Sequence, residues 1–202
     1  MRRTPFLLAA FLIALIPAGA IAQTPVDRTA ALEMLSAGKR WAEIEGAMQA
    51  DGTFLAKEVD IVAAEDSAHM QEMEITGTIR DLDRRRSAMT LLGYKVFWNE
   101  KSKISDPSKR RILSSKLDND MDVKATGNPQ LDGSFLARKI RLKEVIMKDG
   151  KPKHKEGLAG PVEVVDAGGG LLRIMKSNIR LKPECQFFAL PVAVEAPGGT
   201  GN

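Results

Sequence analysis

The stretch Gly46–Ile61, with the sequence GAMQADGTFLAKEVDI, decides how the rest of the chain is interpreted, because a near copy follows 81 residues later. The copy is Gly127–Leu142, with the sequence GNPQLDGSFLARKIRL. Seven of the sixteen positions are identical, and four more carry conservative exchanges. Self-similarity at a fixed offset is the signature of a repeated structural unit. The sequence therefore predicts two equivalent units in one chain.

Each copy has the pattern of a β-hairpin. Asp51-Gly52 and Asp132-Gly133 stand between strand-like runs. Asp-Gly is a strong hairpin signal because glycine readily adopts the positive φ of a tight turn.

The outgoing strand of each hairpin has an apolar stripe of period two. In the first copy, Leu55, Val59 and Ile61 share a parity, which predicts one buried face. Lys57 interrupts this stripe, and a long side chain there indicates a barrel end where its amine reaches water. The second copy repeats the pattern with Leu136, Ile140, Leu142 and the interrupting Arg138.

A second pair of matching segments, Ile75–Asp83 and Leu158–Asp166, lies at an offset of 83 residues and also reads as strands that end in a turn. Gly77 and Gly160 stand inside these strands, where glycine predicts a bulge or a sharp bend. Pro161 cannot donate to a ladder, so its strand is expected to be an edge or to be bulged there.

The fold class predicted from these patterns is all-β, with two tandem small OB-like β-barrel units, because curling removes the exposed edges of short strands. The tandem arrangement places the first unit at 27–104 and the second at 113–190. Periodicity equally allows a second arrangement, in which 75–142 forms one unit while 38–62 and 158–187 close the other.

One helix is predicted, at Asp27–Ser36, with Asp27 as its N-cap and Gly38 as its stop signal.

The chain also resembles the domain-of-unknown-function family 5666, over roughly 38–187. The residues that carry the resemblance are Gly77-Thr78-Ile79, Asp83, Leu92-Gly93, Val96, Gly127, Asp132-Gly133-Ser134-Phe135-Leu136-Ala137 and Ile140. The first hairpin matches in the same way, whereas Pro161 and Lys176 depart from the pattern. Members are repeats in exported bacterial proteins and are generally regarded as small OB-type barrels, so the resemblance implies that fold. It implies no activity, because a fold alone does not assign a function.

The N-terminus has the pattern of a secretory signal peptide over residues 1–22. Arg2 and Arg3 precede an apolar run, Phe6–Ile16, which is followed by small residues. This order predicts cleavage between Ala22 and Gln23. The mature chain is therefore expected to be periplasmic or secreted, without a transmembrane segment, and to end in a disordered tail at 195–202.

Charge and cysteine content narrow the partners. The formal charge falls from +4 to +2 when Arg2 and Arg3 are removed, so a nucleic-acid partner is not expected. Cys185 is the single cysteine, which predicts a small buried side chain or, alternatively, an intermolecular bridge. The partners that remain are an envelope protein or an anionic envelope component.

Two exposed basic clusters are the candidate binding residues, one at a predicted hairpin tip and one in a predicted loop. They are Arg84, Arg85 and Arg86, and Lys109, Arg110 and Arg111. Such cations can attract lipid head groups or acidic glycans, although a solvated turn is the simpler interpretation.

An alternative site uses soft ligands. His69, Met70 and Met73 offer imidazole and thioether groups, the set that suits Cu(I) in an exported protein. They predict a copper or haem carrier as the alternative function; otherwise no cofactor is expected. His154 lies in the matching linker, but the lysines on both sides of it would repel a cation.

No catalytic set is predicted. Neither histidine has an adjacent nucleophile, and the recurring carboxylates stand where turns need a side chain that bonds backbone amides. These carboxylates are Asp51, Asp83, Asp132 and Asp166. The sequence therefore predicts a non-enzymatic binding or structural module of the bacterial periplasm or cell envelope.

Overall fold

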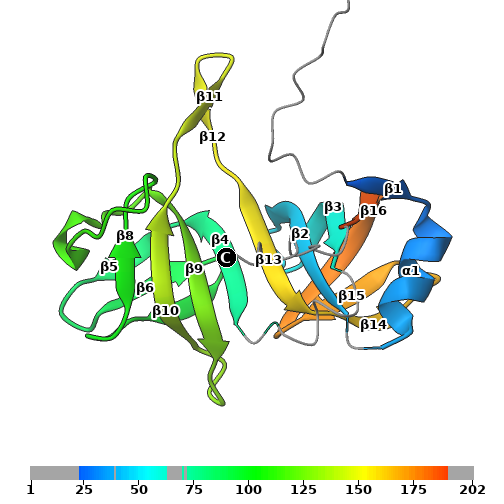
Figure 1. The fold of residues 1–202 in the computed structure, drawn as a ribbon, viewed down its shortest axis with the longest axis horizontal. Helices are drawn as coiled ribbons and strands as arrows, with labels where there is room; N and C mark the ends of the chain where they lie inside the picture. The colour runs from blue at the N-terminus through cyan, green and yellow to red at the C-terminus, as the bar shows by residue number, and fades with distance from the viewer. Residues whose placement is uncertain (1–22, 39, 63–69, 71, 191–202) are drawn as a thin grey trace, which may run out of the picture.

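The computed structural model describes residues 23–38, 40–62, 70 and 72–190 and is predominantly β. The all-β prediction is confirmed. Two lobes stand side by side (Figure 1). The continuous lobe comprises residues 73–142, and the split lobe combines residues 24–61 with 156–189.

The continuous lobe contains β4 (Met73–Thr78), β5 (Arg80–Asp83), β6 (Ala88–Leu91), β7 (Tyr94–Phe97), β8 (Lys103–Ser105), η1 (Ser114–Lys116), β9 (Asp122–Pro129) and β10 (Phe135–Leu142). The split lobe contains β1 (Thr24–Val26), α1 (Arg28–Ser36), β2 (Trp41–Met48), β3 (Phe54–Ile61), β13 (Glu156–Pro161), β14 (Glu163–Asp166), β15 (Leu171–Ile174) and β16 (Ser177–Ala189). A two-stranded hairpin, β11 (Ile146–Lys148) and β12 (Lys151–Lys153), projects away from both lobes (Figure 1).

One hydrogen-bonded sheet runs through both lobes. Its order is β14-β15-β16-β3-β2-β13-β4-β9-β10-β7-β6-β5, with β1 on β16 and β8 on β10. The lobes join where β13 pairs antiparallel with β4. Among the described strands this path does not close on itself, so the structure supports the all-β class without confirming two tandem barrels.

The strands pair in the second of the two arrangements that the periodicity allows. β10 runs parallel to β7 and β8, and β16 runs parallel to β3. The ladders therefore cross between the expected units 27–104 and 113–190. A repeat offset shows which segments are equivalent, but it holds no information on which copies pair with each other.

The joint between the lobes is approximately two-fold symmetric. Ile75 lies opposite Leu158, and these residues correspond to each other at the offset of 83. Tyr94 and Ser177 correspond in the same way, and their hydroxyl oxygens lie 2.8 Å apart. Each lobe thus contributes equivalent positions to the joint, as the subunits of a symmetric dimer do.

The turns of both hairpins form as predicted. Gly52 and Gly133 have φ angles of +81° and +80°. The Asp51 carboxylate accepts a 2.9 Å hydrogen bond from the backbone of Thr53, and the corresponding Asp132 bonds Ser134 in the same way. Asp83 and Asp166 also bond turn amides.

A bulge in each outgoing strand corrects the predicted core stripe. The β2–β3 ladder shifts its register at Lys57, so the buried positions change parity there. Phe54 and Ala56 are buried before the bulge and Val59 after it, whereas Leu55 lies only half-buried on the other side. The second copy shows the same exchange, with the bulge at Arg138, Phe135 and Ala137 buried and Leu136 half-buried.

The strand glycines do not mark bulges, contrary to expectation. The β4–β9 register runs unbroken through Gly77, and the β13–β2 register runs unbroken through Gly160. A Cβ at Gly77 would lie 3.2 Å from the side chain of Leu92, and one at Gly160 would lie 3.1 Å from that of Ile174. Glycine is needed here for close packing. Pro161 is the last residue of β13, beyond its ladder with β4.

The predicted helix is confirmed as α1. Asp27 caps it, because its carboxylate accepts hydrogen bonds from the backbone of Thr29 and Ala30 at 2.9 and 3.0 Å. The expected signal peptide, its cleavage point and the tail at 195–202 lie outside the described residues. Within the described part of the chain, no helix has the length and apolar content of a membrane span.

Candidate functional site

A basic face lies on the outer side of the continuous lobe. Residues directly opposite each other in a ladder share one side of the sheet. The registers place Lys103 opposite Lys139 and Arg141 opposite Lys124. The residues that alternate with them, such as Ile104 and Ile140, are buried, so these four cations face outward. We call them the basic face.

The like charges of the basic face lie close together, and only some of them form ion pairs with carboxylates. Like charges directly opposite each other destabilise a ladder. Lys124 forms an ion pair with Glu74, and the Lys139 amine lies 3.2 Å from a carboxylate oxygen of Glu72. Across the described part of the chain, no ion pair joins Lys103 or Arg141 to a carboxylate. Such a face is suited to an anion from outside the molecule.

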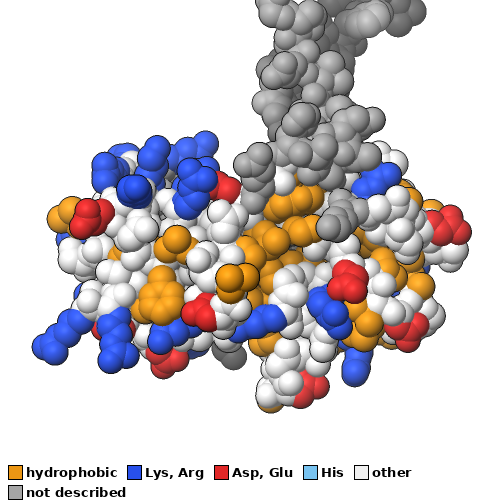
Figure 2. Space-filling model, turned by 90° about the horizontal axis from the view of Figure 1, so that it is seen from below, with side chains coloured by type: hydrophobic (Ala, Val, Ile, Leu, Met, Phe, Trp, Pro, Cys, Tyr) orange, Lys and Arg blue, Asp and Glu red, His pale blue; other side chains and the backbone are white. Residues whose placement is uncertain are grey.

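Lys109 and Arg111 extend the basic face into a surface hollow. The hollow is lined by Glu74, Lys103, Ile104, Ser105, Lys109, Arg111, Lys124, Thr126, Lys139 and Arg141. A β-bridge between Ser105 and Arg111 holds the loop against the edge of β8. Six cations and two hydroxyl groups thus surround a concave site with one carboxylate. Seen from below, Lys and Arg side chains gather over the continuous lobe, and hydrophobic ones occupy the middle (Figure 2).

The corresponding face of the split lobe is acidic. The β2–β3 register places Glu43 opposite Asp60 and Glu45 opposite Glu58. These four residues, the acidic face, line one hollow together with Glu74, Thr76 and Lys124 of the continuous lobe. The two faces therefore meet on the same side of the sheet. Lys57 and Lys155 approach Glu45 at 2.7 and 3.6 Å.

The acidic face holds one carboxyl group in an unfavourable setting. Partial burial, together with the charges of Glu58, Glu43 and Glu45, raises the pKa of Asp60 from 3.8 to about 6. Gln23 donates a 3.2 Å hydrogen bond to the Asp60 carboxylate. Both desolvation and like charge favour the protonated form of a carboxyl group.

The two faces differ by charge reversals at equivalent positions. Glu58 corresponds to Lys139 and Asp60 to Arg141 at the offset of 81, on strands that have equivalent bounds. In the same way, Glu43 on β2 corresponds to Lys124 on β9. The charges thus distinguish two lobes whose strands correspond.

The predicted arginine tip lies apart from the basic face. Arg84 donates to the backbone oxygen of Leu117 at 2.7 Å, so its guanidinium holds the lobe together. Arg86 lies 3.6 Å from the Asp83 carboxylate. Arg85 and Arg86 line a second shallow hollow with Arg111.

Of the predicted loop cations, only Arg110 turns away from both hollows. Its Nε atom lies 2.7 Å from the Asp106 carboxylate, which also accepts a hydrogen bond from the Arg110 backbone. Lys109 and Arg111 line the basic hollow. The structure thus joins part of the predicted set to four cations that the sequence analysis did not single out.

The predicted soft-ligand residues are placed only in part. His69 lies outside the described residues. Met70 is exposed, whereas Met73 packs against the core and against Gly160. Among the described residues, no three His, Cys, Asp or Glu side chains are grouped closely enough to hold a metal ion.

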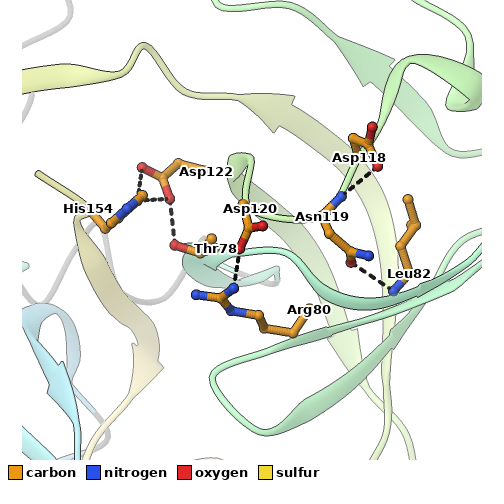
Figure 3. A network of polar contacts seen from close by, with 8 residues as sticks. All are labelled: Thr78, Arg80, Leu82, Asp118, Asn119, Asp120, Asp122 and His154. Atoms are coloured by element: carbon orange, nitrogen blue, oxygen red, sulfur yellow. Dashed lines mark hydrogen bonds and ion pairs between the residues drawn. The ribbon is translucent and has the colours of Figure 1, made fainter. Parts of the chain in front are cut away.

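His154 belongs to a structural network at the lobe joint. Its Nδ1 atom lies 2.8 and 2.9 Å from the carboxylate oxygens of the buried Asp122, and the Thr78 hydroxyl donates to the same carboxylate at 2.6 Å. These residues point toward one another from β9, β4 and the segment before β13, beside the Arg80–Asp120 ion pair (Figure 3). The network fixes the segment that leads into β13 of the split lobe against β9 and β4 of the continuous lobe.

Cys185 is a free thiol, half-buried against the core. Burial raises its pKa to about 11, so the thiolate that would attack an oxidant or a second thiol is scarce at neutral pH.

A signal for the basic face is present in the two hairpin sequences. Toward the end of the near copies, conservative exchanges give way to Glu58/Lys139 and Asp60/Arg141. These reversals lie among the positions at which the two copies differ, whereas the repeat is recognised from the positions that they share. The offset of 81 gives one further reversal just before the copies, Glu43/Lys124, so these three reversals involve six of the eight face residues.

The family model described as "Domain of unknown function (DUF5666)" matches residues 76–141. The predicted resemblance is confirmed over this stretch, which begins in β4 and ends in β10 and so covers the continuous lobe. No curated protein and no solved structure matches the chain.

Proposed function

We propose that the protein is an exported, non-enzymatic binding module of the bacterial cell envelope that holds an acidic glycan on its basic face. The observation that carries the proposal is the register of like charges, Lys103 opposite Lys139 and Lys124 opposite Arg141. Each like-charged pair costs up to about 1 kcal/mol in an isolated sheet. An anion that lies across both pairs turns this repulsion into attraction.

A flexible acidic chain fits the site better than a flat anionic surface does. The cations line a hollow rather than a protruding tip, and Lys109 and Arg111 stand at its rim. Ser105 and Thr126 add hydroxyl groups that can bond sugar hydroxyls and carboxylates. The N-terminal pattern of residues 1–22 supports export.

The OB-like character of each lobe is part of this proposal. β5 follows β4 after one residue, and β14 follows β13 after one residue, so each lobe's strand path ends beside the strand from which it starts. Small curled sheets of this kind bind oligosaccharides and oligonucleotides on an exposed strand face. The basic face lies on such a strand face.

The test is titration of the mature chain, Gln23–Asn202, with polygalacturonate at low and high salt. The proposal expects binding that weakens with salt, and a loss of about tenfold or more for Lys139→Gln with Arg141→Gln. Arg85→Gln with Arg86→Gln is the matched control, because it removes the same charge from the hairpin tip, keeps the structural hydrogen bond of Arg84 and should retain binding.

Equal losses in both variants would reduce the interaction to net charge and overturn the site. Absence of polygalacturonate binding, with binding to vesicles that contain phosphatidylglycerol, would replace the glycan by a lipid surface.

A further inference from the structure

The acidic face and the basic face form one continuous surface. Starting at β3, one row of directly opposed residues reads Asp60, Glu43, Ala159, Glu74, Thr126, Lys139 and Lys103. The neighbouring row reads Glu58, Glu45, Gly157, Thr76, Lys124, Arg141 and Ser105. Each row is acidic on the split lobe and basic on the outer strands of the continuous lobe, and Glu74 of β4 is the one acidic residue that these rows place beyond the joint.

The middle of this surface is low. Gly157 and Ala159 of β13 contribute the smallest side chains to the two rows. The hollow at the joint is lined by these residues, by the acidic face and by Lys124 of the basic face. A second surface can therefore approach the sheet closely at the joint, while longer charged side chains meet it on either side.

We propose that two copies of this chain associate face to face through this surface, with the basic face of each copy on the acidic face of the other. The partner is a second copy because both halves of the required charge pattern occur on the one molecule, at equivalent positions of its two lobes. Charge complementarity of this kind selects the partner and fixes its orientation.

The charge pattern also selects one of two symmetric ways to stack the surface on itself. A two-fold axis that runs along the rows would place acid on acid and base on base. An axis that lies in the surface and crosses the rows at the joint exchanges the lobes. Asp60 then faces Lys139, Glu58 faces Arg141 and Glu45 faces Lys124. Glu43 faces the neutral Thr126, so no acidic-face residue meets a like charge. The resulting interface is isologous, and its contacts occur twice.

Two charges on each face have no strong internal compensation, which leaves them free for the second copy. Among the described residues, Glu58 has no ion pair, and Asp60 accepts only the neutral hydrogen bond from Gln23. On the basic face, Arg141 and Lys103 likewise form no ion pair with a described carboxylate. Stacking therefore brings Glu58 onto Arg141, two charges that the monomer leaves unmatched, and gives Asp60 a cationic partner in Lys139.

The experiment is sedimentation velocity on the mature chain across a dilution series, at low and high salt and without any glycan. The proposal expects a monomer–dimer equilibrium that weakens with salt. Lys139→Glu with Arg141→Glu places acidic residues opposite Asp60 and Glu58, and Glu58→Lys with Asp60→Lys places basic residues opposite Arg141 and Lys139. Each pair is expected to weaken dimerisation about tenfold or more, because like charges then meet in both contacts.

The four-fold variant that combines these substitutions decides the question. It restores the net charge of the natural chain and exchanges the signs at the four facing positions, so dimerisation is expected to return. A natural chain that stays monomeric at low salt overturns the proposal, and so does a four-fold variant that stays monomeric while its thermal melt shows that it is folded.

If the double substitution of Glu58 and Asp60 prevents folding, a single facing pair replaces it. Glu58→Lys and Arg141→Glu then each weaken the dimer, and the two together restore it, because these residues face each other in the stack. Because no glycan is present, failure of this experiment leaves the proposed glycan binding to its own titration.

Discussion

The continuous lobe and the split lobe are built on corresponding strands but present opposite charges. β3 and β10 share their length, their bulge position and their buried phenylalanine, whereas Asp60 and Arg141 on the outer side carry opposite signs. The turn and core residues thus preserve the architecture, whereas the residues at the solvent-facing positions differ between the lobes. The function of this chain is therefore to be sought in the residues that its two halves do not share.

The largest expected effect tests whether the lobes unfold together. Phe54 and Phe135 occupy equivalent positions, and both are fully buried in one contiguous core cluster. Phe54→Ala and Phe135→Ala are each expected to lower the free energy of unfolding by about 3–5 kcal/mol. Urea denaturation followed by fluorescence and by circular dichroism should show one shared transition in every case.

Two separate transitions, with each substitution shifting only one, would show that the lobes are independent. Leu131→Ala is the control, because Leu131 is fully exposed at a hairpin tip and its loss should change stability by less than about 0.5 kcal/mol.

The next effect concerns the equivalent glycines Gly46 and Gly127. A Cβ at these positions would lie 2.3 Å from the backbone oxygen of Leu55 and 2.0 Å from that of Leu136, so the bulged strands must move. Gly46→Ala and Gly127→Ala are each expected to lower the free energy of unfolding by about 2–3 kcal/mol. A thermal melt of each variant measures this loss. Gly93→Ala provides a contrast, because there the strain comes from a φ of +75° and no atom is crowded.

A smaller effect is expected where the lobes differ in structure. Asp122 of the continuous lobe corresponds to Trp41 of the split lobe, so the bonds of its carboxylate to His154 and Thr78 have no counterpart. Asp122→Ala is expected to lower the free energy of unfolding by about 2 kcal/mol, since it leaves buried partners unsatisfied. Asp120→Ala, which removes an exposed ion pair with Arg80, should cost less than about 0.5 kcal/mol. Equal costs would show that the network adds nothing to the joint.

The smallest effect depends on pH and belongs to the acidic face. Because the folded pKa of Asp60, about 6, lies above its usual 3.8, the folded state holds a proton more tightly than the unfolded state does. The ionised Asp60 carboxylate therefore lowers the stability of the folded state. This loss is complete above pH 6 and disappears as the pH falls below about 4. After allowance for solvent screening, Asp60→Asn should therefore stabilise the protein by about 1 kcal/mol at pH 7 and not at all at pH 3.5.

Urea unfolding of both proteins at the two pH values measures this difference. A stabilisation that persists unchanged at the lower pH would assign the gain to packing instead of to charge.

Local signals in the sequence predicted local structure well. Asp27 marked the helix start, and Asp51-Gly52 and Asp132-Gly133 marked hairpin turns, because each of these residues acts on its own backbone neighbours. The predicted buried parity was wrong at Leu55, because the bulge at Lys57 exchanges the two faces of the strand. No particular residue type is required at such a bulge, so the sequence pattern does not reveal it. The sequence also could not predict the strand pairing. Equivalent segments have the same pattern, so pairing within a copy and pairing between copies satisfy it equally well.

The candidate site was predicted less well than the fold. Lys109 and Arg111 stood out because they lie in a basic run, whereas Lys103, Lys124, Lys139 and Arg141 are spread over β8, β9 and β10. Only the ladder registers bring them together. A site assembled across strands is invisible to a search for runs of like residues.

The order of the halves along the chain has a consequence for biosynthesis. The continuous lobe is complete once residue 142 has been made, whereas β3 must wait for β16, with Phe54 opposite Ile179. Chains fold as their parts emerge, and contacts of long sequence separation form late. During synthesis the first hairpin is thus a strand pair without its parallel neighbour, exposed until the final strand arrives. An unpaired strand edge of this kind is the part of a chain that most readily pairs with another molecule.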